Sequence, residues 1–248
     1  MEGETKKITI EIKRLSDDEI RRIFANFNAA LSGHFVLKHR GKKDEVAKIP
    51  GSGDHSATYV NKDILYIPPN ANWWLCADIA HRFVGTPHVD VVVGLVAGTV
   101  NAAWLVKQFL YFLTGREDIG SVYVDEESGK KVFKRGFGEI VSGKNVLFVE
   151  DISTTGESLE LGINAAKEAG GNVIGAALMC NRSGGKVTAE TLGIPRLENQ
   201  LELSSEELKK YLLEDCPLCK DGVGITPTPG HGDKFLQNQE EILDTISG

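Results

Sequence analysis

The stretch Asn145-Val-Leu-Phe-Val-Glu-Asp-Ile-Ser-Thr-Thr-Gly-Glu-Ser-Leu159 decides how this sequence of 248 residues is interpreted. It opens as a short apolar run, presents the adjacent acids Glu150 and Asp151, and passes through a hydroxyl-rich turn into residues that favour a helix. This order predicts a buried strand, a loop and a helix, the repeating unit of an α/β fold. Because parallel sheets bind ligands beyond the carboxyl ends of their strands, we expect the two acids at a binding site.

The turn after the acids supplies the groups that a sugar phosphate needs. Backbone N–H groups at the start of a helix carry partial positive charge, and Gly156 lets a phosphate approach the backbone closely. The carboxylates of Glu150 and Asp151 only accept hydrogen bonds, which suits the two hydroxyls of a ribose. The turn residues predicted to hold the phosphate are Ser153, Thr154, Thr155, Gly156, Glu157 and Ser158. The simpler alternative is that the acids only cap the next helix.

Apolar strands alternate with amphipathic segments around this stretch. The sequence predicts strands over 89–96, 145–149 and 172–180, helices over 101–113 and 158–169, and a hairpin over 121–137. Continuous apolar strands separated by helices indicate a mostly parallel sheet that is covered on both faces. The loops 97–100, 150–158 and 181–185 would then share one edge of the sheet.

The flanking segments predict a smaller accessory region. Ser16 and Glu19 form a capping-box pattern, and apolar residues recur at helical spacing as far as Leu31. Runs that favour strands follow over 35–38, 58–60 and 64–67, a second helix covers 72–84, and further helices begin at Ser204 and cover 234–246. We divide the chain, as one structural unit, into an amino-terminal helix and hood segment (1–70), a core (71–195) and a carboxyl-terminal helical extension (196–248).

Composition and charge argue against some classes of protein. The formal net charge of −7 disfavours a general nucleic-acid binder, which needs a basic surface. No apolar run reaches membrane-spanning length, and residues 1–13 alternate charged and apolar side chains instead of forming a signal peptide. We therefore expect a cytoplasmic protein of ordinary globular composition, without a nucleic-acid or membrane partner.

The stretch 145–159 resembles the phosphoribosyl-diphosphate signature of type I phosphoribosyltransferases over its whole length. The likeness extends towards orotate phosphoribosyltransferases, because Phe35-Val-Leu-Lys38 and Ser52-Gly-Asp-His-Ser-Ala-Thr-Tyr-Val-Asn61 look like two halves of that family's amino-terminal segment, split by an insertion over 39–51. The resemblance implies the type I phosphoribosyltransferase fold, in which helices flank a mostly parallel central sheet and the two ends of the chain build a small hood. It also implies a contact of Lys38 with the base or the pyrophosphate; the alternative is a solvated lysine at a strand edge.

Two further loops match parts of the same family. The loop 97–99 is similar to the one that holds the pyrophosphate in this fold, and the residues assigned to that role are Ala97, Gly98 and Thr99. The run Asn181-Arg-Ser-Gly-Gly185 is similar to the loop whose arginine pairs with the carboxylate of orotate, which assigns that contact to Arg182. The resemblance gives Thr154 a contact with the base as well. Asn181 replaces the aspartate of the family pattern, and the alternative for Arg182 is a surface arginine in a turn.

The catalytic loop of the family matches least well. The family usually carries an Arg-Lys-Glu-x-Lys run, whereas this chain has Tyr123-Val-Asp-Glu-Glu-Ser-Gly-Lys-Lys-Val-Phe-Lys-Arg-Gly136. Cations are still present, and a closing cation together with Mg²⁺ would stabilise the negative charge of the departing pyrophosphate. The catalytic candidates are Lys131, Lys134, Arg135 and Asp151, against the alternative of a solvated hairpin. In the family this loop often reaches a neighbouring subunit, which implies a homodimer.

Four cysteines are too few for a disulfide framework in a chain of this length. Cys216-Pro-Leu-Cys219 has the spacing of half a zinc site. His231 would be a third ligand, and Cys180 or Cys76 a fourth. Because structural zinc needs four ligands and the sequence has no second pair, we expect a packed turn in preference to a metal site. His55 lies inside a segment that matches the family, so it is expected to line the cleft.

The resemblance as a whole implies a Mg²⁺-dependent transfer of phosphoribose from phosphoribosyl diphosphate to orotate, a step of pyrimidine nucleotide synthesis. Two alternatives stay open. The same chemistry would serve another base, such as a purine or xanthine. A regulator that senses phosphoribosyl diphosphate and binds DNA would need a basic surface, which the acidic balance of the chain disfavours.

Overall fold

The structure is a computed structural model that describes residues 12–37, 54–67, 69–85, 87–95 and 97–237. Its centre is a five-stranded sheet in which every neighbouring pair of strands is parallel. The strand order is β4 (Gly120–Tyr123), β3 (Val91–Gly94), β7 (Asn145–Ser153), β8 (Asn172–Asn181) and β9 (Leu197–Glu202). Because the strands share one direction, their carboxyl ends lie along one edge, which we call the rim.

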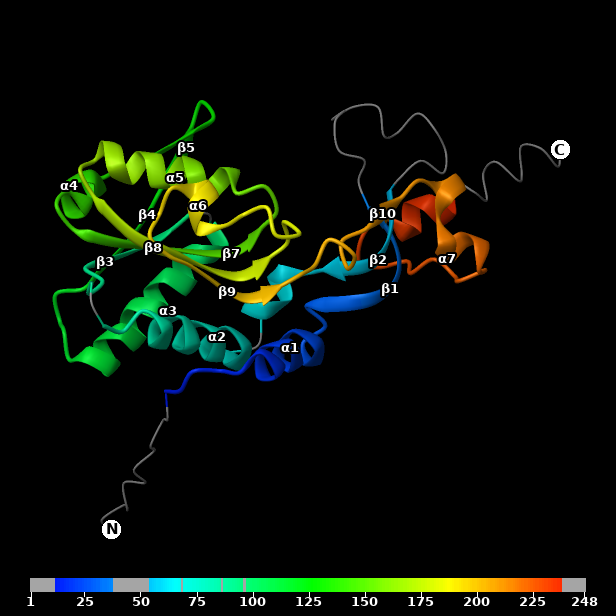
Figure 1. Ribbon diagram of the computed structural model, residues 1–248, viewed down its shortest axis with the longest axis horizontal. Helices are drawn as coiled ribbons and strands as arrows, with labels where there is room; N and C mark the ends of the chain where they lie inside the picture. Colours follow the sequence, from blue (N-terminus) through cyan, green and yellow to red (C-terminus); the bar gives the residue numbers. More distant parts are fainter. Residues whose placement is uncertain (1–11, 38–53, 68, 86, 96, 238–248) are drawn as a thin grey trace, which may run out of the picture.

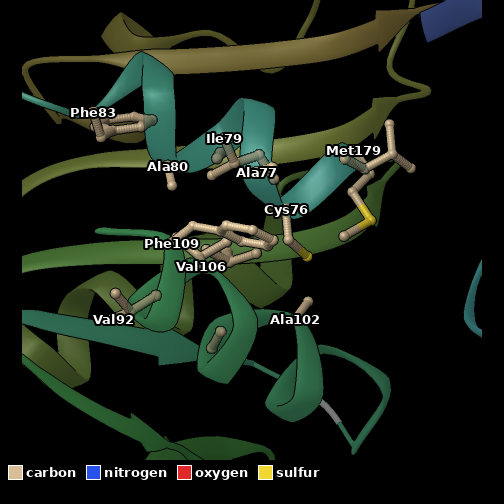
Figure 2. Packing of buried hydrophobic residues seen from close by; sticks show 14 of the residues in the cluster. Cys76, Ala77, Ile79, Ala80, Phe83, Val92, Ala102, Val106, Phe109 and Met179 are labelled. Carbon is tan, nitrogen blue, oxygen red and sulfur yellow. The ribbon is translucent and has the colours of Figure 1, made fainter. Parts of the chain in front are cut away.

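Helices cover both faces of this sheet (Figure 1). On one side lie α1 (Asp17–Asn26), α2 (Pro69–Arg82) and α3 (Ala97–Thr114), and on the other α4 (Phe137–Val141), α5 (Glu157–Glu168) and α6 (Ala189–Leu192). Side chains of β7 alternate between the two faces. Leu147 and Val149 join the core cluster under α2 and α3, where Figure 2 shows the packing of Phe109. Val146 and Phe148 join the cluster under α5. Burial on both faces confirms the predicted α/β fold class.

A smaller antiparallel sheet stands beside the core (Figure 1). Its strand order is β1 (Ala30–Leu37), β2 (Asp54–Val60) and β10 (Lys210–Tyr211), and η2 (Leu213–Asp215) and α7 (Pro217–Lys220) follow β10 directly. We call these five elements the hood. Segments from both ends of the chain build it together. Between hood and core lies the 3-10 helix η1 (Lys62–Tyr66), and β5 (Asp125–Glu127) and β6 (Lys130–Val132) form a separate hairpin.

The amino-terminal elements differ from the predicted ones in two places. α1 ends at Asn26, because Asn28 adopts a positive φ of 53° that a helix cannot continue, and Leu31 already lies in β1. The run 64–67, predicted as a strand, falls within and just after η1. The predicted helix over 72–84 is confirmed as α2.

The carboxyl-terminal part is less helical than predicted. β9 lies beyond residue 195 and pairs with β8 at the edge of the main sheet, where a strand needs fewer apolar residues and is harder to recognise in a sequence. The helix predicted from Ser204 is a single turn, closed by the Glu207 N–H and the Ser204 hydroxyl at 3.2 Å. The next residues form β10, which pairs with β2, and this tertiary pairing overrides the local helix propensity. Residues 232–237 are helical, and the rest of the helix predicted over 234–246 lies outside the described residues.

Among the described helices, none combines the length and apolarity that a membrane crossing requires.

Candidate active site

Asp151 lies near the carboxyl end of β7, and its side chain is almost fully buried. Lys62 Nζ is 2.8 Å from Asp151 Oδ2, and the Tyr66 hydroxyl donates to the same oxygen at 3.3 Å. The Ile152 N–H donates to Asp151 Oδ1 at 2.6 Å. Burial, and after it the charge of Asp151, raises the pKa of the Tyr66 hydroxyl, so the phenol keeps its proton and acts as a donor. These contacts hold the carboxylate in one orientation at the rim.

Glu150 is also buried, and its Oε2 atom has no hydrogen-bond partner among the described residues. Burial, and then the neighbouring charge of Asp151, raises the pKa of Glu150 to about 8, while Lys62 and Lys131 oppose the shift. A buried carboxylate oxygen without a donor is costly. The position therefore fits a group that a ligand would bring, either a sugar hydroxyl or a hard cation such as Mg²⁺.

The start of α3 meets Asp151 at the same edge. A Cβ atom on Gly98 would lie 3.4 Å from Asp151 Oδ2 and 3.6 Å from the Tyr66 ring, so a side chain here would occupy space beside the carboxylate that glycine leaves open. Thr99 is buried, and its hydroxyl accepts the Leu95 N–H at 2.9 Å, which closes the turn between β3 and α3. Ala97 is the first residue of α3. The loop predicted to bind the pyrophosphate thus lies beside Asp151, the acid predicted to bind the ribose hydroxyls.

The turn after β7 leads directly into α5. Ser153 Oγ accepts the Gly156 N–H at 3.2 Å, and Gly156 has a φ of 82°, which favours glycine. Gly156 is also the N-cap of α5 and gives no side-chain cap, so the first N–H groups of the helix are left without an intrahelical acceptor. Thr154 and Ser158 are half-buried, whereas Thr155 and Glu157 are exposed. Such a helix start suits a phosphate.

Arg182 stands next to this turn. The backbone N–H of Arg182 donates to the Ser153 carbonyl at 2.7 Å, and this hydrogen bond joins the loop after β8 to the loop after β7. Burial raises the pKa of the nearby Cys180 thiol to about 12; the Arg182 guanidinium is close enough to lower that pKa and the Asp151 carboxylate close enough to raise it. The arginine and the acid therefore both lie within electrostatic range of the same thiol.

Asn181 organises the Arg182 loop through both ends of its side-chain amide. Its Nδ2 donates to the Val187 carbonyl at 3.0 Å, and its Oδ1 accepts the Ser183 N–H at 3.1 Å. The Ser183 hydroxyl in turn accepts the Val187 N–H at 2.9 Å. An ionised aspartate, which only accepts, would make the second contact of Asn181 but not the first. The departure from the family pattern at this position therefore has a structural reason.

The hairpin cation Lys131 faces the site. Its side chain is 6% exposed, and its Nζ is 3.4 Å from the Leu95 carbonyl, shortly before the pyrophosphate loop. The same ammonium is 3.2 Å from Glu126 Oε2, and its charge reaches Glu150. Burying a lysine needs such partners.

The other two hairpin cations face solvent. The Lys134 side chain is 43% exposed and pairs with Glu127 at 3.5 Å. The Arg135 side chain is 58% exposed, pairs with Asp125 at 2.7 Å and lies over the Tyr123 ring. The structure thus brings one of the three candidate cations to the rim and keeps two on the hairpin surface.

Comparison with known proteins assigns the chain to a family. No family model matches it. The orotate phosphoribosyltransferase of Caldicellulosiruptor bescii is 34% identical over 211 residues, which cover 85% of this chain and 96% of that protein. The chain belongs to the orotate phosphoribosyltransferase family. Another member, from Pelotomaculum thermopropionicum, is 34% identical over 209 residues, covering 84% of this chain and 95% of that protein.

Solved structures of orotate phosphoribosyltransferases share the fold. The Mycobacterium tuberculosis protein aligns with a TM-score of 0.52 at 22% identity, covering 75% of this chain and 97% of that one. The Aeropyrum pernix protein aligns with a TM-score of 0.51 at 19% identity, covering 74% and 93%. At this identity the alignments speak for the fold alone, and they confirm the predicted type I phosphoribosyltransferase fold.

Sequence reasoning missed two residues of the site. Lys62 and Tyr66 both contact Asp151 from η1. Lys62 directly follows Asn61, the last residue of the segment that resembles orotate phosphoribosyltransferases, so one further residue of that match would have included it. Tyr66 gave no usable signal, because the run around it was interpreted as a strand.

Some predicted residues are not at this site. Lys38 lies outside the described residues, so its contact stays a prediction. His55 does not line the cleft; it is fully buried in the hood, where it contacts His34 and Cys219. From the sequence we expected a packed turn at Cys216 and Cys219, and we named further ligands only for the alternative of a zinc site. Within the described residues, the side chains grouped with this pair are His34 and His55, not His231, Cys180 or Cys76.

Proposed function

We propose that the protein transfers the phosphoribosyl group of phosphoribosyl diphosphate to orotate, giving orotidine 5′-monophosphate and diphosphate. The observation that carries the proposal is the position of Asp151. Its buried carboxylate stands where the Gly98 loop, the turn into α5 and the Arg182 loop come together. Membership of the orotate phosphoribosyltransferase family supports the choice of reaction.

The phosphoribosyl group is held by the two loops nearest to β7. Glu150 and Asp151 accept hydrogen bonds from the two ribose hydroxyls, a role for which buried acceptors at the rim are suited. The 5′-phosphate lies at the start of α5 and takes N–H groups of the turn 153–158, with Thr154 also facing the base. The backbone of the loop 97–99 holds the pyrophosphate.

The reaction exchanges one bond at ribose C1 for another. A ring nitrogen of orotate forms the new C–N bond and gives up its proton to the solvent or to the leaving group, while the C1–O bond breaks and its electron pair leaves with the pyrophosphate. Positive charge on the sugar and negative charge on the leaving group develop together. Lys131 stabilises the leaving group, because it is the candidate cation whose ammonium contacts the Leu95 carbonyl, shortly before the pyrophosphate loop. Bound Mg²⁺, held mainly by the substrate, would neutralise charge on the pyrophosphate. Glu150 has a carboxylate oxygen without a partner among the described residues, so it is a protein group that would contact the ion.

Arg182 selects the base. A guanidinium binds a carboxylate through two parallel hydrogen bonds, and orotate differs from uracil by such a carboxylate. The backbone bond between Arg182 and Ser153 keeps this residue close to the phosphoribosyl site. Purines and xanthine have no carboxylate, so a role of Arg182 in binding favours orotate over them.

We also propose that the protein works as a homodimer. Aromatic side chains at helical spacing stand exposed on α3, with Trp104 at 52% and Phe112 at 60% exposure. Exposed apolar patches of this kind mark interaction sites. Light scattering should give twice the mass of one chain, and Trp104→Glu should give the mass of a single chain. A monomeric wild-type protein would overturn the proposal.

A base panel tests the activity. The purified protein with Mg²⁺ and phosphoribosyl diphosphate is offered orotate, uracil, adenine, hypoxanthine, guanine and xanthine, and nucleotide products are separated by chromatography. We expect product from orotate alone. Product from another base would keep the reaction and overturn the substrate. Binding of phosphoribosyl diphosphate without any product would favour a regulatory protein.

A further inference from the structure

Four metal-ligating side chains converge inside the hood. His34, His55, Cys216 and Cys219 each place one ligand atom so that the four atoms lie within 4.8 Å of one another. All but Cys219 are fully buried, and Cys219 is half-buried. This group lies outside the rim and has no part in the proposed transfer.

The sheet of the hood brings the two histidines together. His55 in β2 pairs directly with Val36 in β1, so their side chains share one face. His34 lies two residues before Val36 and therefore points to the same face. At His34 the pairing register of β1 with β2 shifts by one residue, because Gly33 and His34 together lie opposite Ala57 and form a β-bulge.

The carboxyl-terminal segment lays the cysteine pair on this face. Tyr211 of β10 pairs with His55, and the chain then turns through η2 to Cys216. Beyond α7 the chain returns along β1, where the Thr226 N–H donates to the His34 carbonyl at 2.8 Å. The Cys-Pro-Leu-Cys turn is thus fixed on both sides by the strands that carry the histidines.

The distances suit a tetrahedral ion. With Zn–S bonds of about 2.3 Å and Zn–N bonds of about 2.0 Å, the edges of a tetrahedron are roughly 3.3 to 3.8 Å long. Cys216 Sγ and Cys219 Sγ each lie 3.6 Å from His34 Nε2, and Cys219 Sγ lies 3.3 Å from His55 Nδ1. The two histidine nitrogens are 2.8 Å apart, which an ion between them would open by about half an ångström.

A second contact orients His34 for coordination. Its Nδ1 is 2.7 Å from the Val223 carbonyl, which only accepts, so Nδ1 carries the proton. In the neutral ring the Nε2 lone pair then points at both sulfurs and at His55. Histidines that bind metals usually donate their other ring N–H to a carbonyl or carboxylate in this way.

We propose that His34, His55, Cys216 and Cys219 form a structural Zn²⁺ site. Two thiolates and two imidazoles are a donor set that favours zinc, and four protein ligands leave no position for a substrate. The ion joins the β1–β2 pair to a turn that follows by up to 185 residues in the chain. The hood is a small three-stranded sheet whose third strand has only two residues, and small units of this kind commonly depend on such a cross-link.

Metal content is the first test. The full-length protein, purified without chelators or a metal-affinity tag, should contain about one zinc per chain by plasma mass spectrometry. Replacement of the ion by Co²⁺ should produce the visible absorption of tetrahedral cobalt with thiolate ligands. Zinc-free protein that takes up none from solution would overturn the proposal, and so would iron in place of zinc or a disulfide between Cys216 and Cys219.

Variants locate the ion and separate binding from folding. Cys219→Ser and His34→Asn should each lose most of the zinc and the cobalt spectrum, whereas Cys76→Ala, which changes a buried cysteine of the core, should keep both. Cys219→His supplies another zinc ligand at the same place and should retain the metal. Should the serine and asparagine variants fail to fold, the wild-type zinc content and the cobalt spectrum still decide. These readouts do not require activity, so they stand apart from the base panel.

Discussion

The acids of the rim and the metal-ligand cluster of the hood are both buried polar groups, but the chain assembles them differently. Glu150 and Asp151 are neighbours in the sequence, and the turn that serves the same ligand follows immediately. The hood cluster joins residues that stand 164 and 185 positions apart. Local sequence therefore reveals the rim, whereas only the folded chain reveals the cluster.

The two regions also differ in what they leave open. At the rim, Glu150 keeps a carboxylate oxygen without a partner among the described residues, and the pKa of its carboxyl is raised to about 8. In the hood, four ligand atoms lie within 4.8 Å of one another and all come from protein side chains. The rim is therefore arranged to receive a ligand, and the cluster is arranged to hold the fold. Changes in the rim should alter activity, and changes in the cluster should alter stability.

The largest effect is expected from Asp151→Asn. The change removes the negative charge and one of the two acceptor oxygens, and it leaves Lys62 without its buried anion, so kcat/KM should fall on the order of 100-fold or more. Calorimetry should show weaker binding of phosphoribosyl diphosphate. Asp118→Asn, at an exposed acid paired with Arg116, is the control and should bind as the wild type does. Unchanged affinity in the Asp151 variant would remove this residue from the ribose site.

Arg182→Ala should act on one substrate only. Loss of charge-assisted hydrogen bonds to a carboxylate should raise the KM for orotate by about tenfold to a hundredfold, with much less change in the KM for phosphoribosyl diphosphate. Arg196→Ala, at an exposed arginine paired with Glu198, is the matched control for steady-state kinetics. Equal effects on both substrates would contradict the assignment of Arg182 to the base.

Lys131→Ala and Lys134→Ala separate the two faces of the hairpin. Lys131 contacts the Leu95 carbonyl, shortly before the pyrophosphate loop, so its loss should lower kcat by about tenfold or more. Lys134 is an exposed partner of Glu127, and its loss should change kcat much less. A larger effect at Lys134 would mean that the hairpin moves on binding, or that it serves the site of a second copy.

Glu150 should make ligand binding depend on pH. Its pKa is about 8 in the free protein, so the carboxyl is protonated at neutral pH, whereas a cation or a ribose hydroxyl prefers the ionised form. Affinity for phosphoribosyl diphosphate with Mg²⁺ should therefore rise between pH 6 and pH 8, by at most about tenfold per pH unit, and level off above. Glu150→Gln should bind with little dependence on pH in this range. Calorimetry at several pH values measures the slope.

The raised pKa of Glu150 makes stability depend on pH in the opposite direction from ligand affinity. Because folding raises the pKa of Glu150, the folded protein holds a proton that the unfolded chain loses above its ordinary pKa. The free energy of unfolding should therefore fall as pH rises towards 8, by up to roughly 1.4 kcal/mol per pH unit. Urea titrations of wild type and Glu150→Gln should diverge over this range. Parallel curves would show that Glu150 is solvated in solution.

Sequence reasoning recovered the centre of the sheet and the rim because each is encoded in one continuous segment. The strand of Val146 to Val149, the acids after it and the Gly156 turn follow one another in the chain, and the structure keeps this order. Edge elements were harder. β9 is polar enough to look like a loop, and the Ser204 capping pattern formed only one turn because the next residues pair with β2.

Contacts between distant segments could not be predicted from local patterns. Lys62 reaches Asp151 across 89 positions, and although it directly follows a segment that resembles the family, no local pattern pairs it with that acid. The Cys216 and Cys219 pair was visible, but its histidine partners were not, since His34 and His55 are 21 residues apart with no zinc-site spacing. We expected a packed turn because the sequence has no second Cys or His pair at zinc-site spacing. The second pair, His34 and His55, comes together only in the folded chain.

The smallest effect on activity is expected from Cys219→Ser, which tests whether the two regions are separate. Without its metal the hood should lose stability, and the melting temperature should fall by about 5 °C or more. Activity at 25 °C should fall only a few-fold, because the acids lie in β7, Gly98 lies in α3 and Arg182 directly follows β8, and none of these elements belongs to the hood. Differential scanning calorimetry and the orotate assay on the same preparation compare the two readouts. A loss of activity as large as that of Asp151→Asn, in protein that is still folded, would mean that the hood shapes the rim and that the division into a reactive region and a stabilising region is wrong.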